Sequence, residues 1–130
     1  MKKILKISVI AFLAFFLSAY TADEITRQIG NTIESGDAAQ LSEYFSDNIR
    51  LKIDEKDNIY SRKQAEAIIG VFFSGNSPKS YKITSERKSG YSQIVIGIMH
   101  TNQKKFRVYY QLAGEKAARR INFLDIQMLD

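Results

Sequence analysis

The chain has 130 residues, of which 45% are hydrophobic and 25% are charged, and it contains no cysteine. Its 19 basic and 14 acidic residues give a net charge of +5. The absence of cysteine excludes disulfides and a lipid anchor on cysteine, so a domain of this size must be stabilised by its apolar core.

Residues 1–22 have the pattern of a secretory signal peptide. Three lysines lie among the first six residues, an apolar run follows over residues 7–17, and small residues end the segment. That run is shorter than the ~20 residues of a transmembrane helix, and an uncleaved N-terminal anchor is the alternative. Cleavage after Ala22 or after Ala19 fits the pattern. We predict export to the periplasm or the extracellular space, with residues 23–130 forming a single domain.

Removal of the signal peptide would lower the net charge. The remaining 16 basic and 14 acidic residues leave a net charge of only +2. Two groups of basic residues lie at opposite ends of a predicted antiparallel hairpin. One strand carries Lys104, Lys105 and Arg107, and the next carries Arg119 and Arg120. They form no continuous stripe, so we predict no nucleic-acid binding and no membrane association after cleavage.

The first elements of the mature part are two predicted helices with a tight elbow at Gly36. Residues 23–35 carry isoleucine at every fourth position, which is typical of a helix with a narrow apolar stripe. Asp37 is a suitable cap for the second, short helix. The expected apolar face of that helix is formed by Leu41, Tyr44 and Phe45.

A strand, a turn and the clearest helix come next. Residues 48–53 alternate between polar and apolar side chains, and residues 59–60 form a short return strand. The acidic turn between them lacks the ligand spacing of a calcium loop, because Lys56 occupies a ligand position. Residues 61–73 match the helical template completely, and Ser61 with Gln64 predicts a capping box.

The C-terminal part predicts four antiparallel strands, at residues 81–87, 91–100, 104–112 and 118–128. The turn lengths predict that Ile98 lies opposite Phe106. The apolar face under the helices would then contain Ile94, Ile96, Ile98, Phe106, Val108 and Tyr110. Gly97 suggests a bend or a bulge in the second strand. The apolar phase of the last strand switches after Phe123, which a bulge or a sheet covered on both faces would explain.

These elements predict an α+β fold, in which a curved, mostly antiparallel sheet wraps around three helices. Their order resembles the cone of the nuclear transport factor 2-like (NTF2-like, cystatin-like) superfamily. The segment IYSRKQAE at residues 59–66 and the VFF at residues 71–73 are similar to a block of the bacterial domain-of-unknown-function family DUF4783. Residues 96–97 and the FRVY at residues 106–109 resemble later blocks of that family. The resemblance implies the fold and supplies no catalytic motif.

One constellation could carry catalysis. His100 is the only histidine, and the predicted register places Asp125 near the same edge of the sheet, so the two could act as general base and orienting carboxylate. The alternative is an exposed histidine at a strand end without a function. The sequence offers no cysteine, no second histidine and no carboxylate cluster with ligand spacing, so we predict no metal and no cofactor.

We therefore predict a non-enzymatic module that binds a small ligand or a protein. The alternatives are a pocket enzyme of the isomerase or dehydratase type and a structural dimerisation module. The candidate pocket is lined by Phe45, Ile69, Phe72, Phe106 and Tyr110. A homodimer is predicted through an apolar patch on the outer face of the sheet, formed by Val95, Met99, Tyr109, Leu124 and Ile126.

Overall fold

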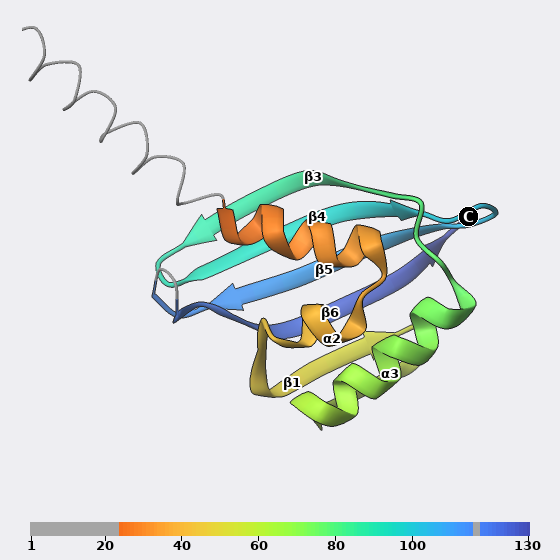
Figure 1. Cartoon of the computed structure of the whole chain (residues 1–130). Coiled ribbons are helices and arrows are strands. Elements are labelled where there is room, and N and C mark those ends of the chain that lie inside the picture. The colour runs from red at the N-terminus through yellow and green to blue at the C-terminus, as the bar shows by residue number, and fades with distance from the viewer. Residues whose placement is uncertain (1–23, 116–117) are drawn as a thin grey trace, which may run out of the picture.

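The computed structural model describes residues 24–115 and 118–130, so the predicted signal peptide lies outside the described residues. One sheet forms a layer, and the helices cover one of its faces (Figure 1). The helices are an N-terminal helix at residues 24–35, α2 (Ala38–Ser42) and α3 (Arg62–Gly75). The strands are β1 (Phe45–Ile53), β2 (Lys56–Ser61), β3 (Ser80–Ser89), β4 (Ser92–His100), β5 (Lys105–Ala113) and β6 (Arg120–Leu129).

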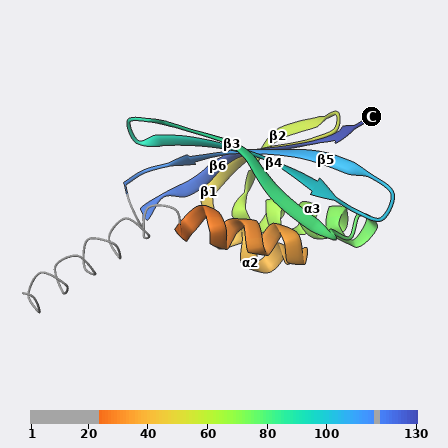
Figure 2. The ribbon, with the colours of Figure 1, turned by 90° about the horizontal axis from the view of Figure 1, so that it is seen from above.

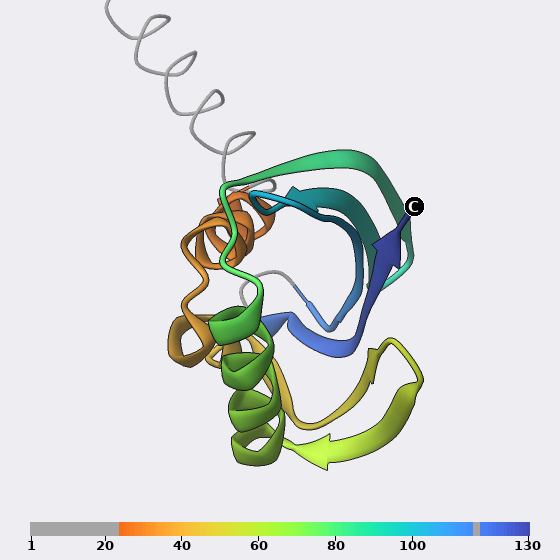
Figure 3. The same cartoon turned by 90° about the vertical axis from the view of Figure 1, so that its right-hand side faces the viewer.

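The six strands have the order β2-β1-β6-β5-β4-β3. Only β1 and β6 are parallel, and all the other described neighbours are antiparallel. The sheet curls around the helices, which lie together on its concave side (Figures 2 and 3). The predicted α+β class, the C-terminal meander and the curved sheet are confirmed.

Local sequence signals explain most of the helix boundaries. Gly36 has φ +66°, a left-handed conformation that ends the N-terminal helix, and Asp37 accepts a 3.0 Å hydrogen bond from the backbone N–H of Gln40 at the start of α2. Ser61 and Gln64 form the predicted capping box of α3. The buried face of α3 consists of Ala65, Ile69, Phe72 and Phe73.

The short helix α2 ends earlier than predicted. Phe45 is the first residue of β1 and not part of the helix face. The backbone of β6 explains the change, because the N–H of Ile121 donates a 2.7 Å hydrogen bond to the carbonyl of Tyr44, and Phe45 pairs with Ile121. Phe45 still enters the core, with 0% of its surface exposed.

The predicted register between β4 and β5 is wrong by one residue. Met99 pairs with Phe106, and Val95 pairs with Tyr110. The turn between the strands contains four residues, 101–104, instead of three, since the N–H of Thr101 donates to the carbonyl of Lys104. A slip of one residue turns every side chain of a strand to the opposite face. The residues Ile94, Ile96 and Ile98 therefore lie on the outer face and are half-buried.

The predicted placement of the dimer patch on the outer face is also wrong. Four of its five residues, Val95, Met99, Leu124 and Ile126, are buried in the core beneath the helices. In β6 the cause is the bulge that the phase switch suggested. Ile121 pairs with Leu112 and Phe123 pairs with Gln111, so Asn122 is an extra residue. Only Tyr109 lies on the outer face as predicted, where its ring packs against Phe123 with centroids 5.5 Å apart.

Candidate ligand site on the inner face of the sheet

The structure does not bring His100 and Asp125 together. His100 is exposed and pairs with Lys105, whereas Asp125 pairs with Tyr109. They are therefore four residues and two strands apart, roughly 15 Å by standard strand spacings. Asp125 instead accepts a 2.7 Å hydrogen bond from Gln127 Nε2. The predicted general base and orienting carboxylate do not form a pair.

The five residues of the predicted pocket lining are all buried. Phe72 of α3 packs edge-to-face on Phe106 of β5, with ring centroids 5.1 Å apart, and this contact joins the helix to the sheet. Phe45 and Ile69 have no exposed surface. These four side chains are core packing. Tyr110 differs from them because its buried ring carries a polar hydroxyl.

Polar side chains gather on the inner face around Tyr110. Three buried polar atoms there have no hydrogen-bond partner within the described part of the chain: Tyr81 Oη, Gln93 Nε2 and Tyr110 Oη. Tyr110 is 0% exposed, Gln93 1% and Tyr81 9%. Most buried polar groups in proteins are hydrogen-bonded, so each exception requires an explanation. We call Tyr81, Gln93, Tyr110 and Arg119 the inner polar cluster. A fourth unpartnered atom, Asn122 Oδ1, belongs to the bulge of β6.

Two glycines position the ring of Tyr81. A Cβ added to Gly97 would lie only 2.6 Å from Tyr81 Oη, and one added to Gly30 would lie 3.3 Å from Tyr81 Cε2. The ring is therefore held between β4 and the N-terminal helix. β3 has a bulge at this level, because Ile83 pairs with Gly97 whereas Ser85 pairs with Ile96.

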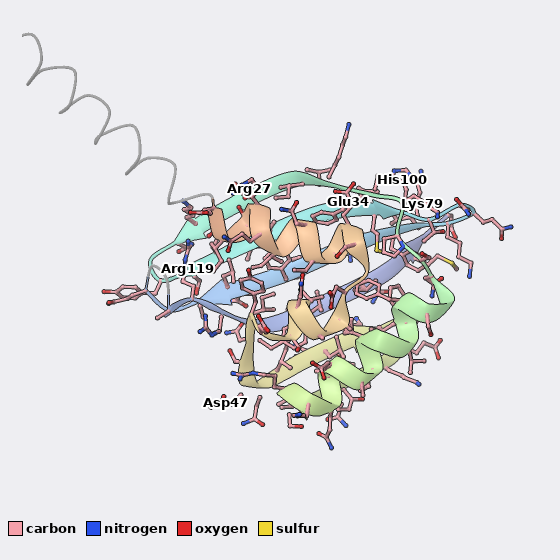
Figure 4. All side chains as sticks on the ribbon, in the orientation of Figure 1. Arg27, Glu34, Asp47, Lys79, His100 and Arg119 are labelled. Carbon is pink, nitrogen blue, oxygen red and sulfur yellow. The ribbon has the colours of Figure 1, made fainter. Side chains whose placement is uncertain are left out.

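Arg119 orients the amide of Gln93. Its Nη1 donates a hydrogen bond to Gln93 Oε1, so the amide nitrogen of Gln93 is the group without a partner. Arg119 lies at one end of the sheet and His100 at the other (Figure 4). The only charged member of the inner polar cluster is thus remote from the histidine on which the catalytic prediction depended.

The electrostatics keep both tyrosines protonated. Burial raises the pKa of Tyr81 and of Tyr110 far above the usual tyrosine range. Glu86 raises both values further, and Arg119 acts in the opposite direction on Tyr110. Both hydroxyls therefore remain available as hydrogen-bond donors at every physiological pH.

The outer face carries polar pairs that are already satisfied. Arg50 donates two hydrogen bonds to the carboxylate of Asp57, of 3.0 and 2.8 Å, and its guanidinium lies 4.9 Å from the ring centroid of Phe123. Arg107 lies 4.0 Å from Asp125. This face does not offer the apolar patch that the sequence predicted.

The ion pair between Arg50 and Asp57 leads to a prediction about pH dependence. The hydrogen bonds from Arg50 lower the pKa of Asp57 below its usual value. Such a carboxylate stabilises the fold above its unfolded pKa of about 3.9, and this contribution is lost as the pH falls through the lower folded value. Arg50→Met is expected to return the pKa of Asp57 to the usual range, measured by NMR titration of its carboxyl carbon. Arg62→Met, which removes the partner of Asp47, is the control and should leave Asp57 unchanged.

Residues 24–115 and 118–130 contain no group of three or more histidine, aspartate or glutamate side chains placed to hold a metal ion. None of the helices in this part of the chain is long and apolar enough to cross a membrane.

The sequence did not predict the inner polar cluster, because the predicted register turned the wrong face of β4 toward the helices. With the observed register, Gln93 is the one polar side chain in an inward row that continues with Val95, Gly97 and Met99. A glutamine in a buried apolar row can indicate a polar site, but the row can be recognised only when the register is known.

Comparison with known proteins gives a family and a fold. The sequence profile described as "Domain of unknown function (DUF4783)" matches residues 26–127. No curated protein matches the chain. A DUF4783 family protein from Bacteroides uniformis is 25% identical with a TM-score of 0.75, covering 80% of this chain and 96% of its own. One from Bacteroides ovatus is 22% identical with a TM-score of 0.75, covering 79% and 94%. An NTF-2 like protein of unknown function from Silicibacter pomeroyi is 14% identical with a TM-score of 0.59, covering 90% and 98%.

Proposed function

The chain belongs to the DUF4783 family and has an NTF2-like fold, and from this premise we propose that it is a non-enzymatic module that binds a small molecule at the inner polar cluster. One observation carries the proposal: on the concave face of the sheet, three buried polar atoms of Tyr81, Gln93 and Tyr110 lack hydrogen-bond partners among residues 24–115 and 118–130. A buried polar group without a partner costs about 1–3 kcal/mol, and a ligand that supplies the missing partners recovers that free energy. Such a cost is typical of a functional site.

The enzymatic alternative has less support. It required His100 beside a carboxylate in the interior, and the structure holds His100 and Asp125 apart on the other side of the sheet. The inner polar cluster contains no group that is ionised near neutral pH except Arg119. A tyrosine with a raised pKa is a poor general base, so these side chains are suited to holding a molecule and not to abstracting a proton.

Export and self-association remain proposals that come from the sequence. The signal peptide pattern supports secretion of the mature part. A homodimer would have to use the outer face as the structure has it, where Ile94, Ile96, Ile98 and Tyr109 are half-buried. Because the ligand site lies on the inner face, such a dimer would be compatible with ligand binding.

The proposal predicts opposite effects of one substitution on stability and on binding. Tyr110→Phe removes only the unpartnered hydroxyl, so the unliganded protein is expected to gain about 1 kcal/mol in free energy of unfolding. Urea denaturation measures this gain. Protein purified from its host under native conditions should carry a small molecule, detected by native mass spectrometry, and Tyr110→Phe should carry less of it.

Tyr109→Phe is the matched control. It removes the same atom from the neighbouring residue, whose ring lies on the outer face against Phe123. We expect it to change stability by less than about 0.5 kcal/mol and to leave the bound molecule unaffected. A less stable Tyr110→Phe protein, together with the absence of any bound molecule, would show that the hydroxyl has a purely structural partner and that this is not a ligand site.

A further inference from the structure

We infer that the inner polar cluster receives a single carboxylate group at the head of a mainly apolar ligand. This inference rests on the proposed function and specifies the chemical class of the molecule. It is carried by the kind of hydrogen-bonding group that each member of the cluster presents and by the apolar surroundings of those groups.

Every unpartnered atom of the cluster is a donor. Gln93 Nε2 can only donate, and its orientation is held by Arg119, which occupies the oxygen of the same amide. The hydroxyls of Tyr81 and Tyr110 stay protonated because burial opposes their ionisation. A ligand group that accepts hydrogen bonds can satisfy all three atoms together, and an ionised oxygen accepts stronger hydrogen bonds than a neutral one.

The charges nearby set the charge of the ligand. The charge of Arg119, which donates a hydrogen bond to Gln93, acts to lower the pKa of Tyr110 against the larger effect of burial, while Glu86 contributes an opposing negative charge. Glu86 is exposed, so water screens its charge, whereas Gln93 and Tyr110 are almost completely buried. One cation and one screened anion favour a singly charged group. They do not provide the several cations with which proteins usually hold a phosphate dianion.

The rest of the inner face is apolar and defines the remainder of the ligand. Tyr110 pairs with Val95 and Leu124, and Gln93 pairs with Leu112. All three of these apolar partners are at most 1% exposed. A ligand whose head meets the donors lies among apolar side chains, and burying its own apolar surface against them contributes to binding.

Four probes with the same six-carbon chain test the head group: hexanoate, hexanamide, hexan-1-ol and hexylammonium. The protein is purified from its host, any bound molecule is removed by dialysis, and dissociation constants are measured from NMR chemical shifts. A hydrogen bond to a charged group raises affinity by about tenfold or more. Hexanoate should therefore bind at least about tenfold more tightly than hexan-1-ol or hexylammonium. The affected amides should lie on the inner face of β4 and β5.

Substitutions separate the contribution of the donors from that of the apolar surroundings. Tyr110→Phe and Arg119→Gln are each expected to weaken hexanoate binding by about tenfold and to change hexan-1-ol binding little. Tyr109→Phe should leave both unchanged. Equal or tighter binding of hexan-1-ol or hexylammonium at the same amides would overturn the carboxylate inference while the proposed binding function stands. If none of the four probes shifts these amides, both the inference and the proposed function are wrong.

Discussion

Gly97→Ala is expected to lower the free energy of unfolding by about 2–3 kcal/mol, the cost of forcing an extra methyl group against a buried ring. The new methyl group would lie 2.6 Å from two ring carbons and from the hydroxyl oxygen of Tyr81, which is closer than real Cβ atoms approach a neighbour. The ring cannot simply retreat, because the N-terminal helix lies beside its other edge, where a Cβ added to Gly30 would be 3.3 Å from Tyr81 Cε2. Urea or thermal denaturation measures the loss.

A double-mutant cycle identifies the cause of this loss. In a Tyr81→Leu protein the ring is absent, so Gly97→Ala should cost much less than in the original chain, with a coupling of about 1–2 kcal/mol between the two sites. Gly75→Ala is the control, since nothing lies within 4 Å of its Cβ position, and we expect a neutral or slightly stabilising change. Equal costs of Gly97→Ala in both backgrounds would mean that β4 needs glycine for its backbone and not for Tyr81.

Phe72→Ala is expected to produce a still larger loss, of about 3–5 kcal/mol, because it removes a buried ring and leaves a cavity. Phe72 is 9% exposed and packs against Phe106 and Phe73, with centroids 5.1 and 5.8 Å away. These contacts hold α3 on the concave face of the sheet. Chemical denaturation gives the free energy, and the loss should appear in circular dichroism of both the helix and the aromatic side chains.

The adjacent residue of α3 supplies the matched control for Phe72→Ala. Val71 is 73% exposed and points away from the sheet, so Val71→Ala should change stability by no more than about 0.5 kcal/mol. Similar losses at positions 71 and 72 would contradict the described face of α3. They would also remove the reason for placing the ligand site between the helices and the sheet.

The elements with strong local signals were predictable from the chain alone. Residues 61–73 have a complete helical pattern with a capping box, and the structure contains α3 with that cap. The four C-terminal strands were predictable because short polar turns separate alternating apolar runs. The bulge at Asn122 was predictable as one of two explanations for the phase switch in β6. In each case the information lies within a few neighbouring residues.

Local sequence patterns thus specify the order and type of the elements and carry the family resemblance. Which side of β4 faces the helices depends on the tertiary structure. Residues 94–99 are apolar on both faces apart from Gly97, so their pattern cannot distinguish the faces, and one extra residue in the turn at 101–104 reverses them. That reversal turns Gln93 inward, onto the face that carries Tyr110, and moves Val95 and Met99 of the expected dimer patch into the core, whereas the bulge at Asn122 buries Leu124 and Ile126. The candidate site joins side chains from β3, β4 and β5 with Arg119, which lies just before β6. Such long-range proximity is set by packing and register, which local patterns do not encode.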